Sequence, residues 1–541
     1  MEIEARTTKL SLISSTIYSK LQSDGDNVMA STNSNIDIVG RRTLDQMLES
    51  SARGRNDLCF ILQADQSVIT FGEFLAQRRV AELMLRSQGV SRGDAVLIHM
   101  PTSLLQVALM FGLYRIGAVA AMSNPANKLR EVDAIALRSG AQWLVIDDDD
   151  TGLISALRQQ GRAVLPASAF NPILDVKPGD TLSSESHGEP PVTSNSPATM
   201  IFTSGTSSEP KCVVYTHGHQ VWGAECYSRQ LNLMSDSLLM HHFPLFHMNG
   251  LNQLCAAVLA GARLLLLERF RSGLFDTYLD KFAPTTTYLN GTHIKMIRET
   301  GSTLKKSSPL RRVGMALQMG DSDYDWFDTK YGTVLSEGYG QTESIAACLC
   351  NPATGTKRAC CGLPIFGYEA RLINEKGQAC ESGEIGELLV RSYSRWGIMH
   401  GYDGDPEATA KTLVDGWLHT GDMMRQDQDG YFYFVDRAKD IIKRAGENIS
   451  AREVEKMLEL HPDILEAAVV GRYDRLRDEV PVAFVVSRTA DLNAEDVLAF
   501  CRIQLAPHKV PEDLYIVNAL PKTAVGKIEK KLLRASLQPQ S

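Results

Sequence analysis

A hydroxyl-rich loop between two apolar stretches is the strongest candidate for phosphate chemistry. Residues 201–218 read IFTSGTSSEPKCVVYTHG, with five hydroxyl side chains around Gly205 and a lysine, Lys211, further on. A Walker A loop needs Gly-Lys-Ser/Thr before a helix, whereas here Pro210 and Cys212 flank the lysine and a strand is expected to follow. Hydroxyls, backbone N–H groups and the lysine charge can still hold a triphosphate. Taken alone, the stretch fits a polar turn between strands equally well.

Two later stretches each place one carboxylate where a nucleotide could meet it. SEGYGQTES (336–344) ends an apolar strand and carries Glu343. Mg²⁺ commonly takes one or two carboxylates together with phosphate oxygens, so Glu343 is a candidate metal ligand. GWLHTGD (416–422) places Asp422 after a tight turn, where it could accept both hydroxyls of a ribose.

Two stretches in the C-terminal part of the chain are dense in charge. DRAKDIIKRAGENIS (436–450) contains Arg437 and Gly446, and LPKTAVGKIEKK (520–531) presents Lys527 after a glycine. A solvated surface turn is the commoner explanation for such a charged run. A nucleotide-binding role therefore depends on how these stretches combine with the others.

The segments that must position these residues alternate between strands and helices. AVLIHM, QWLVID, RLLLLE and GTVLSEGYG are apolar runs of strand type, and TFGEFLAQRRVAELMLRSQG has a helical pattern. This alternation predicts an α/β fold with parallel sheets. The apolar run at 97–122 is interrupted by Pro101 and Arg115, which indicates a strand and a buried helix rather than a membrane span. Residues 172–197 are expected to form a connector.

The length of 541 residues predicts more than one domain. We expect an N-terminal extension at 1–40, a large domain at 41–435 and a small C-terminal domain at 436–541, because composition changes near both boundaries. The net charge of −8 argues against nucleic acid and against a stable membrane anchor. Neither a secretory signal nor a peroxisomal terminus is visible, so we expect a cytoplasmic protein.

Ten cysteines are spread through the chain and do not suggest a disulfide framework. Cys348, Cys350, Cys360 and Cys361 lie close in sequence, but their CxC and CC spacing is poor for zinc. Free thiols are the favoured interpretation.

The order and spacing of the five motifs resemble the acyl-adenylate-forming superfamily, which includes acyl- and aryl-CoA ligases, peptide-synthetase adenylation domains and firefly-type luciferases. The resemblance runs from about residue 42 to 535. It implies a large N-terminal domain of layered sheets and helices and a small, mobile α+β lid. It also implies an ATP-dependent carboxylate–CoA ligase that forms an acyl-adenylate, releasing pyrophosphate and then AMP, with ATP, Mg²⁺ and coenzyme A.

The resemblance assigns roles to matching positions. The catalytic set is Thr203, Lys211, His247 and Lys527. The cofactor-binding set is Ser204, Gly205, Thr206, Tyr339, Gly340, Thr342, Asp422, Arg437, Lys439, Lys443 and Gly446, and the metal ligand is Glu343. In this assignment Tyr339 stacks on adenine, Lys439 lies at the hinge, and Gly446 lines the path of coenzyme A.

Two stretches depart from the family or point to a subgroup within it. The loop at Gln318-Met319-Gly320 differs from the usual Gly-Ala-Pro type, which leaves its role open. HHFPLFHMNG (241–250) lacks the acid of amino-acid-activating domains and is similar to CoA ligases, with His247 beside the acyl pocket or packed in the core. The C-terminal blocks look closest to bacterial crotonobetaine/carnitine–CoA ligases.

The motifs say less about which carboxylic acid is activated and which group accepts the acyl chain. Candidate acyl-pocket residues are His247, Asn249, Tyr288, Asn290, Met315 and Gln318. This mixture favours a compact or polar acid over a long alkyl chain. A carrier-protein thiol or an amine could replace coenzyme A as acceptor. A non-catalytic nucleotide-binding homologue is the third hypothesis, and the retention of every charged motif residue argues against it.

Overall fold

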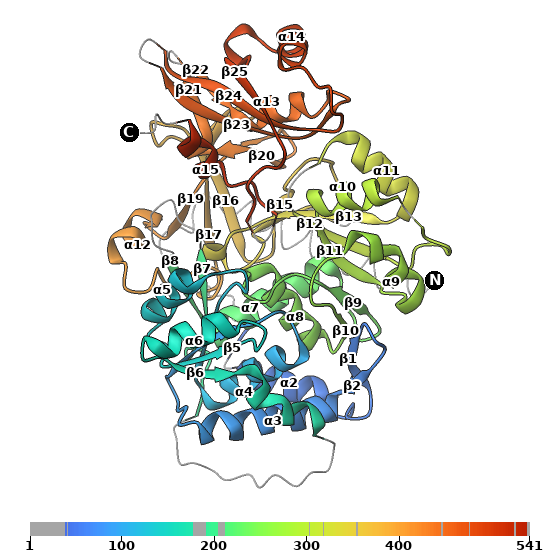
Figure 1. The fold of residues 1–541 in the computed structure, drawn as a ribbon, viewed down its shortest axis with the longest axis vertical. Helices are drawn as coiled ribbons and strands as arrows, with labels where there is room; N and C mark the ends of the chain where they lie inside the picture. The colour runs from blue at the N-terminus through green and yellow to red at the C-terminus, as the bar shows by residue number, and fades with distance from the viewer. Residues whose placement is uncertain are drawn as a thin grey trace, which may run out of the picture.

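The computed structural model describes residues 38–40, 42–176, 191–203, 211–301, 303–316, 319–352, 355–444, 447–474, 477–523 and 526–537. Four sheets and their helices form a mixed α/β fold, with a large N-terminal part and a small C-terminal part at one end of the long axis (Figure 1). This confirms the predicted fold class.

A six-stranded sheet has the order β6-β5-β3-β4-β7-β8. Its strands are β3 (Ala95–His99), β4 (Val119–Met122), β5 (Trp143–Ile146), β6 (Ala163–Pro166), β7 (Pro197–Thr203) and β8 (Lys211–Thr216). It is accompanied by α4 (Leu104–Ile116), α5 (Leu129–Ser139), α6 (Thr151–Gln159) and the 3₁₀ helix η1 (Ala167–Asp175). β3 and β4 are buried along their whole length, as parallel strands covered on both faces must be.

A nine-stranded sheet has the order β15-β14-β13-β12-β11-β9-β10-β1-β2. Its strands are β1 (Cys59–Gln63), β2 (Val68–Thr70), β9 (Leu238–His241), β10 (Arg263–Leu266), β11 (Thr286–Asn290), β12 (Arg312–Ala316), β13 (Val334–Tyr339), β14 (Leu349–Cys350) and β15 (Leu363–Pro364). Its helices are α3 (Phe71–Ser87), η2 (Ser272–Leu274), α9 (Phe275–Phe282), α10 (Gly291–Thr300) and α11 (Asp321–Tyr331). The helix α2 (Leu44–Ala52) packs against other helices, α8 (Met248–Ala260) and α4 among them. β9, β11, β12 and β13 run parallel, so their carboxyl ends share one edge.

Two buried helices join these sheets. α7 (His217–Leu231) and α8 (Met248–Ala260) pack against each other, and nearly every residue of both is buried. Residues of both helices belong to the largest hydrophobic core, together with residues of both sheets. The ends of β8 and β9 are thereby held at fixed positions around one core.

A third sheet extends the large part toward the C-terminus. It consists of β16 (Tyr368–Ile373), β17 (Ile385–Ser392), β18 (Leu413–Val414), β19 (Trp417–Gln426) and β20 (Phe432–Arg437), with α12 (Pro406–Thr412) beside it. The short 3₁₀ helix η4 (Ala438–Asp440) then leads out of this sheet.

The C-terminal part has its own sheet and its own core. Its strands are β21 (Ile441–Arg444), β22 (Glu447–Ser450), β23 (Ile464–Asp474), β24 (Asp478–Ser487) and β25 (Asp513–Val517). Its helices are α13 (Ala451–Leu458), α14 (Ala494–Gln504), η5 (Pro507–Lys509) and α15 (Lys530–Ser536). Apolar side chains form two separate clusters about this sheet. The boundaries at 40/41 and 435/436 remain predictions.

Most predicted elements are present, with two differences. The strand expected through 211–218 ends at Thr216, because its hydroxyl accepts from His219 N (3.2 Å) and caps α7. The connector expected from 172 begins later, since η1 continues to Asp175. The run at 97–122 forms β3, α4 and β4 as a strand–helix–strand unit. Within the described ranges, none of the helices has the length and apolar character to cross a membrane.

Burial keeps several histidines around α7 and β9 neutral, which predicts acid sensitivity. It lowers the pKa of His217 and His219 to about 3 and that of His241 to about 4. An unfolded histidine titrates near 6.5, so below that pH the unfolded state binds more protons. Stability is therefore full above about pH 6.5 and falls as pH decreases, by up to about 1.4 kcal/mol per pH unit for each histidine.

Thermal unfolding should accordingly shift to lower temperature between pH 7 and pH 5. His242→Phe tests the cause, because burial lowers the pKa of His242 well below its usual value and its ring lies beside Phe243 and Phe270. The variant should show a shallower pH dependence of unfolding than the parent. An unchanged slope would contradict this account.

Candidate active site

The hairpin of β7 and β8 carries both ends of the hydroxyl-rich loop. The strands are antiparallel, and Thr203 pairs with Lys211 at the last position before the loop. Ser204, Gly205 and Thr206 lie outside the described residues. The strand–loop–strand arrangement predicted for this motif is therefore present, in contrast to the strand–loop–helix of a P-loop.

Tyr402 connects Lys211 to Glu343. The ammonium of Lys211 lies over the Tyr402 ring, with Nζ 4.4 Å from the ring centroid. The hydroxyl of Tyr402 donates to Glu343 Oε1 (2.6 Å), and Glu343 is 8% exposed. The Tyr402 side chain thus contacts both Lys211 of the hairpin and Glu343, the candidate metal ligand, and keeps these two residues close together.

The turn that carries Glu343 is held closely against its surroundings. A Cβ at Gly340 would lie 2.5 Å from the carbonyl oxygen of Ala346, so only glycine fits there. The carbonyl of Thr342 accepts from Tyr215 Oη (2.7 Å). Ile345 has φ of +62°, which is unusual for a β-branched residue, and its carbonyl accepts from Asn252 Nδ2 (2.7 Å). Buried hydrogen bonds therefore fix the backbone on both sides of Glu343.

Asp422 forms the second acidic position. It lies inside β19, next to Gly421 (φ +66°), where the pairing of β19 with β17 shifts register, rather than after the tight turn expected from sequence. The hydroxyl of Tyr339 donates to Asp422 Oδ2 (2.5 Å), and Arg437 Nε lies 3.3 Å from Oδ1. Burial raises the pKa of Asp422, against the lowering effects of Arg437, Tyr339 and the ammonium of Lys527.

Lys527 comes to these residues from the other end of the chain. It follows Gly526, whose φ is +78°, and its backbone N–H donates to Thr523 Oγ1 (3.1 Å). The Lys527 side chain is exposed to solvent, but much of its surroundings is protein. The resulting loss of hydration lowers the pKa of Lys527, and the positive charge of Arg437 lowers it further. The carboxylates of Asp422 and Glu343 oppose this shift. A bound anion would reverse it, since it would favour the charged ammonium.

His247 ends the segment between β9 and α8. It is the N-cap of α8, and its Nδ1 accepts from Asn249 N (3.2 Å). Burial, reinforced by the charge of Lys527, lowers the pKa of His247 to about 3, so the ring is neutral at physiological pH. His247 is thus a half-buried helix cap within electrostatic reach of Lys527, and its place beside an acyl pocket stays a prediction.

The other acyl-pocket candidates divide between the helix α8 and the sheet edge. Asn249 accepts from Gln253 Nε2 (2.6 Å), and Asn290 caps α10 by accepting from His293 N (2.7 Å). Tyr288 and Met315 are buried in neighbouring strands, where Tyr288 Oη donates to Met315 O (3.2 Å). Asn290 lies at the carboxyl end of β11, the edge where ligands bind in open α/β sheets.

Some predicted residues are not described. Gly446 and Gln318 lie outside the described residues, and of Lys439 and Lys443 only the backbone is described. Tyr402 is the contact that sequence reasoning missed. It stands in HGYDGDPEA (400–408), a loop that runs into α12 and has no acid–base pattern, so its aromatic side chain and glycine neighbours were the only signal.

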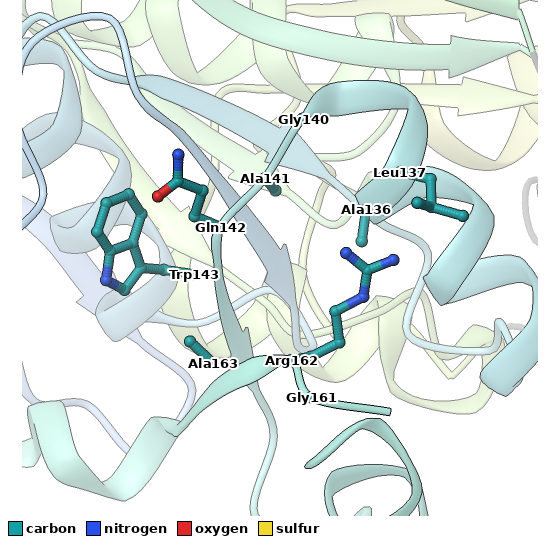
Figure 2. A pocket seen from close by; sticks show the side chains of 9 residues that line it. All are labelled: Ala136, Leu137, Gly140, Ala141, Gln142, Trp143, Gly161, Arg162 and Ala163. Atoms are coloured by element: carbon teal, nitrogen blue, oxygen red, sulfur yellow. The ribbon is translucent and has the colours of Figure 1, made fainter. Parts of the chain in front are cut away.

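The cysteine-rich stretch holds no cluster suited to a metal. All ten cysteines are free, and within the described ranges no group of three or more His, Cys, Asp or Glu side chains could hold a metal ion. A hollow of about 510 Å³ lies elsewhere, between α5 and the strands β5 and β6, with Trp143 and Arg162 on its wall (Figure 2). Arg162 is paired with Asp133 (2.6 Å), and none of the predicted site residues lines this hollow.

Comparison with known proteins identifies the class. The chain matches the model for AMP-binding enzymes over residues 48–403 and the model for the C-terminal domain of AMP-binding enzymes over residues 453–527. The chain belongs to the AMP-binding enzyme family. This confirms the predicted class, an adenylate-forming acid–thiol ligase that uses ATP and coenzyme A.

Similar curated proteins narrow the resemblance. The chain is 33% identical over 525 residues to a crotonobetaine/carnitine–CoA ligase of Citrobacter koseri, covering 92% of this chain and 100% of that protein. A crotonobetaine/carnitine–CoA ligase of Salmonella arizonae is 32% identical over 519 residues, with the same coverage of both. The similarity to this subgroup that the C-terminal blocks indicated is confirmed.

Solved structures share the fold at lower identity. The anthranilate CoA ligase AuaEII in complex with anthranoyl-AMP has a TM-score of 0.83 at 23% identity, covering 94% of this chain and 99% of that chain. ATP-bound MatB from Rhodopseudomonas palustris has a TM-score of 0.81 at 22% identity, covering 91% and 98%.

Tyr402→Phe should weaken the reaction with ATP because it removes the hydrogen bond to Glu343 and keeps the ring under Lys211. A hydrogen bond to a charged group contributes about 1.5–3 kcal/mol, so we expect a loss of about tenfold to a hundredfold in kcat/KM for ATP in pyrophosphate exchange.

Tyr431→Phe is the matched control. Tyr431 also lies under a lysine, with Lys357 Nζ 4.3 Å from its ring centroid, and its hydroxyl donates to Gly355 O (2.7 Å) away from the site. This variant should keep the parent kcat/KM. Equal losses in both variants would refute a specific role for Tyr402.

Proposed function

We propose that this protein is an ATP-dependent carboxylate–CoA ligase that activates a compact, polar acid. The observation that carries the proposal is the electrostatic interaction of Lys527 with Asp422 and Glu343, which precede it in the chain by about 105 and 184 positions. Lys211 reaches the same Glu343 through Tyr402. Lys211 and Lys527 therefore act on the same small region as Glu343 and Asp422. Cations gathered in this way favour the binding of a polyanion such as a triphosphate.

The first step joins two anions, and the cations of the site offset their repulsion. A carboxylate oxygen attacks the α-phosphorus of ATP, the bond to the β-phosphate oxygen breaks, and pyrophosphate leaves with that oxygen's electron pair. Lys211 stabilises the departing phosphates, and Lys527 stabilises the attacking carboxylate and the bridging oxygen. Fixed charges of this kind act mainly on the transition state and need no covalent enzyme intermediate.

The remaining residues orient the nucleotide. Asp422 accepts the ribose hydroxyls, with Arg437 and the Tyr339 hydroxyl holding the carboxylate in place. Thr203, Ser204, Gly205 and Thr206 surround the phosphates from the hairpin. Gly340 and Thr342 supply close backbone approach, and Tyr339 contacts adenine.

Glu343 suits a magnesium ion. A single, largely buried carboxylate beside phosphate oxygens is a donor set that Mg²⁺ accepts. The Glu343 carboxylate accepts a hydrogen bond from the Tyr402 hydroxyl, and an oxygen ligand of this kind suits Mg²⁺ better than the metals that prefer thiolate or imidazole. When bound, Mg²⁺ neutralises charge on the phosphates. Tyr402 fixes one oxygen of Glu343 and so orients the carboxylate.

The second step requires a different arrangement of the small domain. A thiolate attacks the acyl carbon, the bond to AMP breaks, and AMP leaves. We assign Lys439 to the hinge, and Lys443 and Gly446 to the path of coenzyme A, on the basis of family resemblance. Rotation at the hinge would remove Lys527 from the site and open that path.

The acid is proposed to be small and polar. The relatives named above act on crotonobetaine and carnitine, and buried amides near the sheet edge have unused hydrogen-bonding capacity. Among the described residues Gln253 Oε1 has no hydrogen-bond partner, and the amide of Gln230 lies beside the Tyr288 hydroxyl and the Cys350 thiol. Gln230 lies beside Gly338, where a Cβ would be 2.8 Å from its Nε2. Buried amides of this kind favour a ligand that can form hydrogen bonds. We place the reaction in the cytoplasm.

Two variants separate the half-reactions. Lys527→Ala should abolish adenylate formation, measured as acid-dependent pyrophosphate exchange, and spare thioester formation from supplied acyl-adenylate. Gly446→Trp should do the reverse by obstructing coenzyme A. Lys522→Ala is the control, because this neighbouring lysine pairs with Glu466 and should be dispensable. Parallel loss of both half-reactions in both variants would refute the two-arrangement mechanism.

A panel of acids with Mg-ATP, each with and without coenzyme A, tests the reaction itself. We expect pyrophosphate release with short polar acids, carnitine and crotonobetaine among them, and a CoA thioester detected by mass spectrometry. Acid-dependent release without a thioester would indicate a carrier-protein or amine acceptor. ATP binding without release for any acid would indicate the non-catalytic alternative.

A further inference from the structure

Glu337 is a buried carboxyl that the roles above do not use. It lies in β13, two residues before Tyr339, and is 4% exposed. Its Oε1 accepts from Tyr324 Oη (2.6 Å) and Ala359 N (3.1 Å), and its Oε2 accepts from Cys360 N (3.1 Å). This carboxyl joins the strand that leads to the Glu343 turn with α11 and with the segment before β15.

The small domain is docked against the neighbouring helix α10. Lys295 Nζ lies 3.1 Å from Glu459 Oε2, just after α13, and Arg488 Nη1 lies 2.5 Å from Glu299 Oε1. Lys456 precedes Glu459 by three residues and so shares its face of the helix. That face brings the Lys456 ammonium within electrostatic range of Glu337.

We propose that Glu337 is a positioning residue for adenylate formation: as an anion it attracts Lys456 and so favours the domain arrangement that brings Lys527 to the site. The argument rests on three features together. The carboxyl is buried and held by three donors, the small domain is docked on α10, and the docked face presents a lysine. The inference rests on the proposed function, because one readout is a half-reaction.

The groups around the pair define its pH dependence. Glu337 faces the Tyr324 hydroxyl, the thiols of Cys350, Cys360 and Cys361, and Lys456. Burial raises the pKa of the Glu337 carboxyl to about 7, although the Tyr324 hydroxyl, the two backbone donors and Lys456 lower it.

Lys456 has charged neighbours of its own. Besides Glu337 it faces Arg452, Glu459 and Asp321. Burial and Arg452 lower the pKa of Lys456, and the three carboxylates oppose them. Docking therefore brings the positive charge of Lys456 toward Glu337 and Asp321 of the large domain, whereas Glu459 belongs to its own domain.

The sign of the pH effect follows from this attraction. Lys456 approaches Glu337 only when the small domain is docked, so the docked form stabilises the anion and binds fewer protons than the undocked form. The ratio of docked to undocked protein should rise as pH increases through about 7. For one attraction between a buried carboxylate and a lysine ammonium, we expect a rise of about threefold to tenfold between pH 6 and 8.

Glu337→Gln tests the charge with little change in shape. Pyrophosphate exchange by the parent should rise between pH 6 and 8, whereas the variant should be several-fold slower at pH 8 and lack that rise. Thioester formation from supplied acyl-adenylate should be unchanged. A purely structural role would instead lower both half-reactions at every pH, and that result would overturn the proposal.

Lys456→Met removes the other charge of the Glu337–Lys456 pair, on the small domain. It therefore tests the same attraction even if Glu337→Gln fails to fold. It should reproduce the loss of pH dependence, and the double variant should lose no more than either single one. Lys522→Met is the control on the same domain and should behave as the parent. Additive losses in the double variant would overturn the coupling.

A distance measurement separates this inference from the proposed function. Fluorophores at Thr329→Cys and Asp491→Cys, both exposed, report the approach of the small domain to α11 without any catalysis. Protein without the added cysteines corrects for labelling of the half-buried Cys59 and Cys380. Energy transfer should rise with pH in the parent and not in Glu337→Gln.

The two readouts fail in different ways. A pH-dependent distance that Glu337→Gln abolishes supports the inference even if no acid gives pyrophosphate exchange, which would refute the proposed function alone. A distance that is independent of pH in active protein overturns the inference and leaves the ligase intact.

Discussion

The site depends on balancing two buried carboxylates with cations that the chain supplies from distant segments. Glu343 and Asp422 are each less than a tenth exposed, and an unpaired buried charge is costly. Arg437 lies beside Asp422, Lys211 reaches Glu343 through the Tyr402 ring, and Lys527 acts on both. The last of these cations belongs to the small domain, so the charge balance of the site is linked to the position of that domain.

The fold brings these charges together because the strands and helices that carry them are fixed by a shared core and end close to one another. α7 and α8 share one core with both large sheets, which sets the β7–β8 hairpin against the edge where β9, β11, β12 and β13 end. The third sheet brings Asp422 and Arg437 together as partners across β19 and β20. The chain then leaves that sheet through η4, so a change of backbone angles there would move Lys527 and leave the other groups in place.

The inferred role of Glu337 extends the same electrostatic logic to the domain interface. Exposed ion pairs such as Arg488–Glu299 contribute little to stability by themselves. A buried carboxyl is different, because its charge is poorly screened and its ionisation state can change near neutral pH. The carboxyl lies in the strand that leads to the Glu343 turn, so the segment proposed to orient the nucleotide would also sense the small domain. Docking and adenylate formation would then favour the same protonation state.

The sequence by itself determined the fold class, most strands and helices, and the family, because apolar periodicity and the order of short motifs are local properties of the chain. It did not reveal Tyr402, whose predicted role depends on Lys211 lying over its ring and on Glu343 accepting a hydrogen bond from its hydroxyl. It placed Asp422 after a turn, whereas strand pairing with Arg437 puts it inside β19, next to a shift in register. Glu337 stood unnoticed beside Gly338, since nothing local marks a carboxyl whose donors come from α11 and from residues 359 and 360. Contacts between segments far apart in sequence decide burial and charge, and only the tertiary structure establishes those contacts.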